Sequence, residues 1–251
     1  MALFKTKNPA LGASTFQTLD HIDSGAPTMT ILGATQKVLL LGFATLLAAM
    51  FTWNLFQRAD DGALVSILMK VGFISGFILA LIIIFKKTTA PYLAPVYAVA
   101  EGLALGAISA FFDDGVPGIA MEAILLTFSI LFGMLIIYRL RIIRVTDTFR
   151  MIVFSATAGI ALCYIISMVA NLFGMHVPLI HDNGTVGIVF SLVVVVVAAL
   201  NLLMDFRFIE DGAQQNAPKY MEWYAAFGLL VTVIWLYLEI LRLLAKLASR
   251  R

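Results

Sequence analysis

Two acidic side chains lie within long apolar segments near the C-terminal end of the sequence. Asp205 ends the run of residues 199–205, and Glu239 lies within residues 235–242. An ionisable side chain inside hydrocarbon costs several kcal/mol, so such residues usually face a protein interior or a water-filled cavity. These two carboxyl groups are therefore the first candidates for a functional site.

Carboxyl groups on consecutive membrane helices can respond to pH. Two acids that lie close together in a medium of low dielectric cannot both ionise cheaply, so the pair can share one proton. Loss of that proton leaves two negative charges, which repel each other or recruit a cation. Oxygen ligands suit a hard cation such as Ca²⁺. We therefore predict that Asp205 and Glu239 form a pH-sensing gate on a cation path and contact Ca²⁺ transiently.

Other polar residues near this pair are candidates for tuning it. Arg242 follows Glu239 by three residues, which permits an ion pair on one helix face. That pairing is also the alternative interpretation of Glu239, as a locally neutralised structural charge. Lys70 can act as a counter-charge to Glu101 or Asp205. The predicted tuning partners are Arg242, Lys70, Glu101 and Asn201.

The composition indicates a membrane protein. The chain has 251 residues, of which 61% are hydrophobic and 13% are charged, whereas soluble domains carry about 25% charged residues. Seven apolar segments approach the roughly 20 residues that cross about 30 Å of hydrocarbon. Each must be helical, because no water is present to satisfy the backbone. The predicted spans are residues 38–56, 64–85, 92–112, 118–138, 152–173, 186–208 and 227–247.

The sequence therefore predicts an all-α, polytopic membrane domain over residues 37–251. Residues 1–36 are polar and form a predicted flexible tail, without the apolar region of a signal peptide. Glu122 and Glu222 lie near the ends of their spans, from which their side chains can reach the membrane surface.

The basic residues favour a cytoplasmic N-terminus. With that orientation, 11 of the 17 Lys and Arg residues lie on the inner side and 5 on the outer side, and Lys70 lies within a span. This distribution obeys the positive-inside rule. Four of the five outer residues lie at the C-terminus, so the sequence leaves the side of the C-terminus open.

Small residues recur at helical spacing in three spans. Gly72 and Gly76 form one stripe, Gly102 and Gly106 form another, and a third is built on Gly159 with Ser155 and Ala158. Such stripes let the backbones of membrane helices approach closely. We expect close helix packing at each.

Enzymatic motifs are not found in the sequence. It contains no H-E-x-x-H, G-x-S-x-G, P-loop or G-x-G-x-x-G pattern. His21, His176 and His181 fall in the predicted tail or an outer loop, and the single cysteine, Cys163, lies within a span. We therefore predict no enzymatic activity, no resident cofactor and no nucleic-acid partner.

Four blocks, residues 93–106, 199–205, 217–224 and 236–244, resemble the bacterial branch of the Bax inhibitor-1/YccA family, also called the transmembrane Bax inhibitor motif family. The resemblance runs from about Lys37 to the end of the chain. It implies a seven-helix bundle with the last helix at the centre. It also implies a pH-sensitive calcium leak whose sensor is a pair of aspartates on the last two helices.

The sensor residues of that family can be followed in this sequence. Asp205 matches the first aspartate, and Glu239 stands where the second is expected, with one more methylene. The resemblance also implies suppression of cell death in eukaryotes and modulation of a membrane-bound protease in some bacteria. Two alternatives to the cation leak therefore stay open: a non-transporting regulator that binds other membrane proteins, and an H⁺-coupled transporter of small solutes. The expected location is a bacterial inner membrane, with the lipid bilayer, Ca²⁺ and H⁺ as partners.

Overall fold

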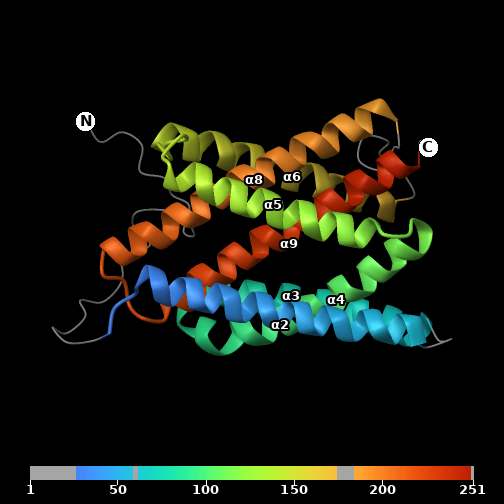
Figure 1. The fold of residues 1–251 in the computed structure, drawn as a ribbon, viewed down its shortest axis with the longest axis horizontal. Coiled ribbons are helices and arrows are strands. Elements are labelled where there is room, and N and C mark those ends of the chain that lie inside the picture. The colour runs from blue at the N-terminus through green and yellow to red at the C-terminus, as the bar shows by residue number, and fades with distance from the viewer. Residues whose placement is uncertain (1–26, 59–61, 174–183, 250–251) are drawn as a thin grey trace. The chain divides into compact units, whose positions relative to one another are not determined.

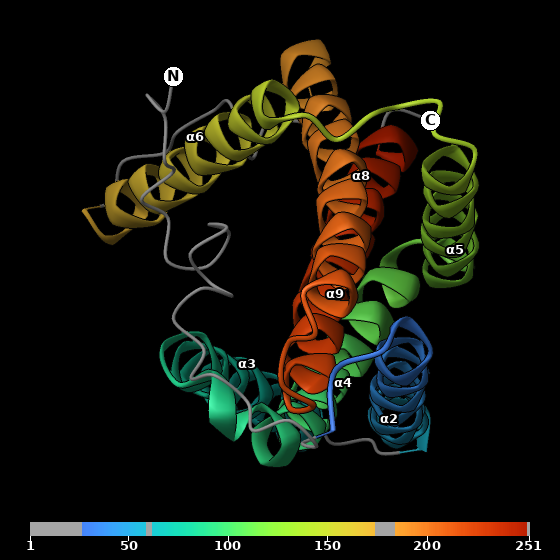
Figure 2. The same cartoon turned by 90° about the vertical axis from the view of Figure 1, so that its left-hand side faces the viewer.

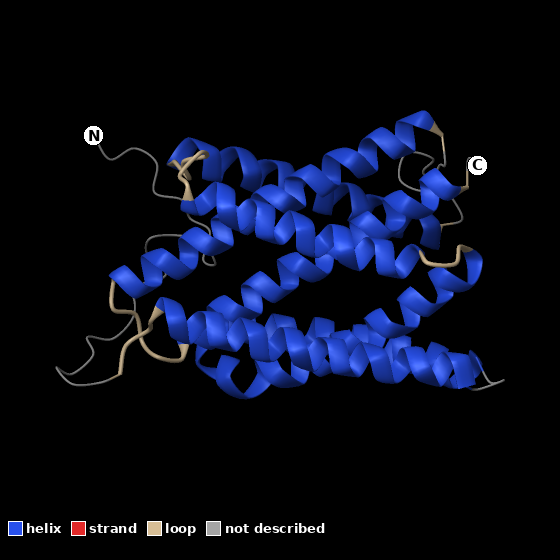
Figure 3. Ribbon diagram, viewed as in Figure 1, coloured by secondary structure: helices blue, strands red, loops and turns tan. Residues whose placement is uncertain are grey.

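The computed structural model describes residues 27–58, 62–173 and 184–249. Over these residues the fold consists of helices and loops (Figure 3). In chain order (Figure 1), the elements are α2 (Ile31–Arg58), α3 (Gly62–Phe85), η1 (Lys87–Thr89), α4 (Ala90–Gly115), α5 (Ile119–Arg139), α6 (Asp147–Leu172), α8 (Thr185–Gln214) and α9 (Met221–Ala248). Within these ranges, seven helices are long and apolar enough to cross a membrane. The prediction of an all-helical membrane protein with seven spans is confirmed.

The helices extend beyond the predicted apolar segments. α2 begins at Ile31, inside the predicted tail, and α8 continues past Phe208 to Gln214. Arg207 lies 2.8 Å from Asp211 and 3.5 Å from Glu210 within the same helix. These pairs at i,i+3 and i,i+4 stabilise a polar helical end, and hydropathy alone does not detect such an end.

The chain divides into two compact units. The first comprises Met1–Ile108 and Arg207–Leu230, and the second comprises Ser109–Phe206 and Val231–Arg251. The division passes through α4, α8 and α9, so each of these helices contributes to both units.

Glycines set the helix packing of the first unit, in which α4 lies between α3 and α2 (Figure 2). A Cβ atom at Gly72 of α3 would lie 2.5 Å from the carbonyl oxygen of Ala100 on α4. On α4, a Cβ at Gly102 would overlap the carbonyl oxygen of Thr45 on α2. The predicted stripes on these two helices are confirmed as sites of close approach.

The third predicted stripe, built on Gly159 with Ser155 and Ala158, shows no close approach of another helix at its glycine. A Cβ at Gly159 of α6 would meet no atom of the described residues within 4 Å. The expectation of close packing at this glycine is wrong, because small residues also occur where a helix faces outward.

The core of the second unit joins α6, α8 and α9. Ile160, Val194 and Val197 are buried together, and Trp235 of α9 packs against them.

Large exposed apolar side chains are frequent on the other spans, whereas α9 has only Val231 and Leu247. α9 therefore exposes few large apolar side chains.

Candidate functional site

Glu239 belongs to a closed polar network in the second unit. Its side chain is buried, and its Oε1 atom accepts a hydrogen bond of 2.7 Å from the Tyr164 hydroxyl. Arg242 Nη1 donates to Glu239 Oε1 at 3.0 Å and to Oε2 at 3.1 Å. The same nitrogen donates to the Tyr164 hydroxyl oxygen at 2.8 Å. The ion pair predicted from the three-residue spacing is therefore present.

Packing fixes the tyrosine of this network. Tyr164 lies on α6 next to the buried core of the second unit, and its ring packs nearly perpendicular to that of Phe190 on α8, with 6.4 Å between the ring centres. The Arg242 guanidinium lies 5.3 Å from the centre of the Tyr164 ring, within the range of a cation–π interaction. The sequence analysis missed Tyr164. Tyr164 is one of several hydroxyl-bearing residues in this span, so the sequence did not reveal that it pairs with Glu239.

Asp205 of α8 is held differently. The Thr232 hydroxyl of α9 hydrogen-bonds to its carboxyl group. The second oxygen, Oδ2, is buried, and no hydrogen-bond partner for it is found among the described residues. Thr232, which the sequence analysis also missed, precedes Glu239 by two helical turns, or about 10 Å along α9.

The two carboxyl groups therefore lie at different levels along α9, because Asp205 contacts Thr232 two turns before Glu239. No hydrogen bond joins the Asp205 and Glu239 carboxyl groups within the described ranges. Sharing of a proton between them stays a prediction.

Asn201 links α8 to α6 one turn before Asp205. Its Nδ2 atom donates to Thr157 Oγ1 and to the carbonyl oxygen of Val197, each at 2.8 Å. Residues four apart share a helix face, so Asn201 and Asp205 give this part of α8 a polar face. The role of Asn201 as a tuning partner of Asp205 stays a prediction.

Glu101 and Lys70 are not brought together. Glu101 is buried on α4, and a Cβ at Gly76 of α3 would lie 2.5 Å from its Oε1 atom. Lys70 is exposed on α3, and no ion pair of this lysine is present in the described part of the chain. Glycine in α3 therefore makes room for the Glu101 carboxyl.

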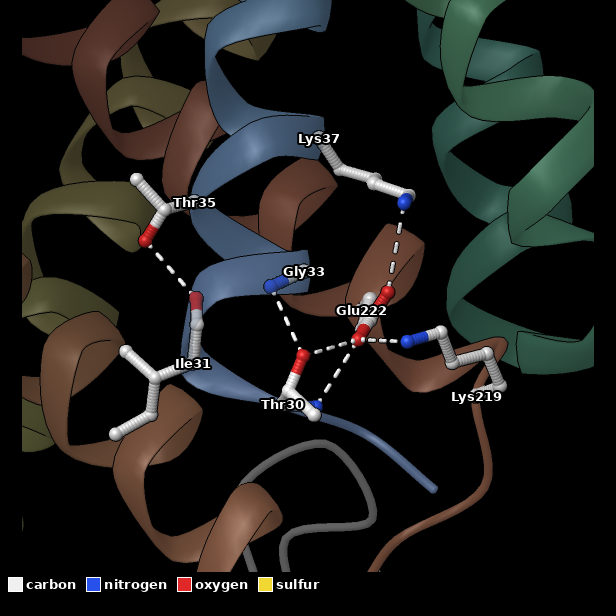
Figure 4. Close-up of polar contacts among 7 residues, drawn as sticks. All are labelled: Thr30, Ile31, Gly33, Thr35, Lys37, Lys219 and Glu222. Carbon is white, nitrogen blue, oxygen red and sulfur yellow. Dashed lines mark hydrogen bonds and ion pairs between the residues drawn. The ribbon is translucent and has the colours of Figure 1, made fainter. Parts of the chain in front are cut away.

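Glu222 is the centre of a second network, in the first unit (Figure 4). Its Oε1 atom accepts hydrogen bonds of 3.0 Å from the backbone nitrogen and from the hydroxyl of Thr30. Lys219 Nζ lies 2.8 Å from Oε1, and Lys37 Nζ lies 3.5 Å from Oε2. We name these four residues, Thr30, Lys37, Lys219 and Glu222, the N-terminal clamp.

The clamp corrects one expectation from the sequence. Glu222 was expected to reach the membrane surface, but its side chain is fully buried because two lysines and Thr30 surround it. Glu122, by contrast, is exposed in the first turn of α5, as expected.

Backbone contacts reinforce the N-terminal clamp. The Met29 nitrogen donates to the Ala217 carbonyl oxygen at 2.7 Å, and Thr28 forms an antiparallel bridge with Pro218. The segment that leads into α2 is thereby fixed to the segment that leads into α9.

No group of three or more His, Cys, Asp or Glu side chains is arranged to hold a metal ion in the described ranges. The three histidines lie outside those ranges. Asp205 and Glu239 supply too few oxygens for a resident Ca²⁺ site, which takes about six to eight. The predicted transient Ca²⁺ contact is untested by this geometry.

One protein-family model covers nearly the whole chain. A family model described as "Bax inhibitor 1 like" matches residues 6–249. The match contains both networks and all seven spans. A comparison with curated proteins gives no match.

Proposed function

Because the chain belongs to the Bax inhibitor 1-like family, we propose that it is a pH-sensitive leak for Ca²⁺ or another cation, with Asp205 and Glu239 as its gate. The observation that carries this proposal is the buried Oδ2 atom of Asp205, which has no hydrogen-bond partner among the described residues. An ionised carboxylate left in this state costs several kcal/mol, and either a proton or a cation removes that cost. The site is therefore suited to exchange a bound proton for a bound cation.

Glu239 has a different role in the proposed gate. Arg242 and Tyr164 donate hydrogen bonds to its carboxyl group in the structure, and the positive charge of Arg242 offsets its negative charge. Release of the arginine would expose a second carboxylate about two turns of α9 from Thr232. Two acids in one unit would then attract a divalent cation more strongly than either acid alone.

Ca²⁺ flux into proteoliposomes tests the gate. Wild type, Asp205→Asn and Glu239→Gln are compared from about pH 5 to about pH 9, a range that brackets carboxyl groups perturbed by burial. We expect a sigmoidal pH response in wild type and a flattened response in both variants. Glu122→Gln removes an exposed acid and serves as the matched control. Flux in Asp205→Asn that equals wild type at every pH would refute the gate.

A second candidate function is a non-transporting regulator of other membrane proteins. The closed Glu239–Arg242–Tyr164 network favours it, because these groups satisfy one another and need no ion. This alternative predicts no flux above empty vesicles and co-purification with a partner such as a membrane-bound protease. Uptake of a small solute that collapses with the proton gradient would instead favour an H⁺-coupled transporter.

The proposed leak lies in a bacterial inner membrane with a cytoplasmic N-terminus. The excess of Lys and Arg on the same side as the N-terminus supports this orientation. Protease digestion of an N-terminal epitope in sealed vesicles of known orientation would test it.

A further inference from the structure

The connection between α5 and α6 combines exposed basic and exposed apolar side chains. Arg139, Arg141 and Arg144 are exposed, and no ion pair of theirs is present within the described residues. Leu140 is 67% exposed and Ile142 is 66% exposed. Within residues 139–150 the sequence has four arginines and one acid, Asp147. We name residues 139–144 the arginine–aliphatic loop.

Backbone hydrogen bonds give this loop a defined shape. Ile142 N donates to the carbonyl oxygen of Ile137 at 3.1 Å, and Arg141 N donates to that of Tyr138 at 3.0 Å. Arg141 has a φ of 54°. These features define a Schellman motif, in which the left-handed position is usually glycine. An arginine at this position is conformationally costly, so the turn itself does not account for the choice of arginine.

We propose that the arginine–aliphatic loop binds the headgroup of anionic phospholipids at the membrane surface. Arginine forms paired hydrogen bonds with phosphate oxygens. The loop joins the ends of two membrane spans, where basic residues meet anionic headgroups. Leu140 and Ile142 alternate with the arginines, which suits a ligand with acyl chains rather than a free phosphate.

Native mass spectrometry of the full chain tests this binding, with phosphatidylglycerol and phosphatidylcholine added separately. We expect preferential retention of phosphatidylglycerol. Arg139→Gln/Arg141→Gln/Arg144→Gln should weaken it by roughly fivefold per arginine removed. Lys86→Gln removes one exposed basic charge outside the loop and should weaken retention less than the removal of any single loop arginine does.

Arg141→Gly separates binding from folding. Glycine adopts the left-handed conformation more easily, so this variant should keep the turn and be at least as stable as wild type. It should nevertheless bind phosphatidylglycerol roughly fivefold more weakly. Binding equal to that of wild type would overturn the role of Arg141.

Two further outcomes would overturn the lipid assignment itself. Equal retention of phosphatidylglycerol and phosphatidylcholine would exclude headgroup selectivity. Binding of free glycerol phosphate as tightly as the lipid would exclude a contribution of the acyl chains. Leu140→Ser/Ile142→Ser keeps every charge and should also lower lipid retention, and unchanged retention in this variant would contradict the proposal.

Discussion

Gly33 of α2 and Glu222 of α9 fit together because the glycine has no side chain. A Cβ atom built at Gly33 would overlap the Glu222 carboxyl group. The Gly33 nitrogen also donates to the Thr30 hydroxyl at 2.9 Å, and that hydroxyl in turn donates to Glu222. One backbone position therefore permits the burial of the acid and takes part in its hydrogen-bond network.

Gly33→Ala should destabilise the protein by about 1–3 kcal/mol, the usual cost of overpacking. The added methyl group would push the carboxyl away from Thr30 and Lys219. Gly42→Ala on the same helix is the control, because a Cβ there meets nothing within 4 Å. Alanine at position 42 should be neutral or stabilising by up to about 1 kcal/mol. Thermal unfolding in mild detergent measures both, and equal stabilities of the two variants would contradict the fit.

Glu222→Gln should also destabilise the protein, by about 1–3 kcal/mol. The amide can still accept from Thr30, but the charge that pairs with Lys37 and Lys219 is lost. Hydrogen exchange at the backbone of residues 29–34 should accelerate, because this segment is fixed by the clamp. Glu122→Gln, at an exposed position, should stay within about 0.5 kcal/mol of wild type. Unchanged exchange in Glu222→Gln would show that the backbone contacts of Thr28 and Met29 are sufficient to hold this segment.

Tyr164→Phe should cost about 1–3 kcal/mol, because the hydroxyl bonds to two charged groups. If Glu239 belongs to the proposed gate, the variant should also change the pH profile of Ca²⁺ flux. Tyr92→Phe, on an exposed side chain, is the matched control and should change neither property. Lower stability with an unaltered flux profile would assign the Tyr164 network to structure alone.

The sequence was sufficient for the spans, for one ion pair within a helix and for the positions at which helices approach closely. The Arg242–Glu239 pair follows from spacing, because residues three apart share a helix face. The close approaches at Gly72 and Gly102 follow from the stripe pattern. The seven spans follow from hydropathy, because lipid leaves the backbone no alternative to a helix.

Contacts between distant segments could not be predicted. Thr30 and Glu222 are 192 residues apart, and Tyr164 and Glu239 are 75 apart. Periodicity shows which face of a helix is polar but not which helix that face meets. For this reason the sequence indicated only that Glu222 lies near the end of a span. Its partners Thr30, Lys37 and Lys219 are identified by the folded structure.

Cys163 makes the protein suited to site-directed spin labelling. It is the only cysteine in the chain and lies half-buried on α6. A single change, Cys163→Ala, therefore gives a cysteine-free background. A Cβ at Gly42 of α2 or at Gly133 of α5 meets no described residue within 4 Å, so cysteines at these positions are suited to carry nitroxides. These positions belong to different units, and electron paramagnetic resonance between them would report interunit distances as pH or Ca²⁺ is varied.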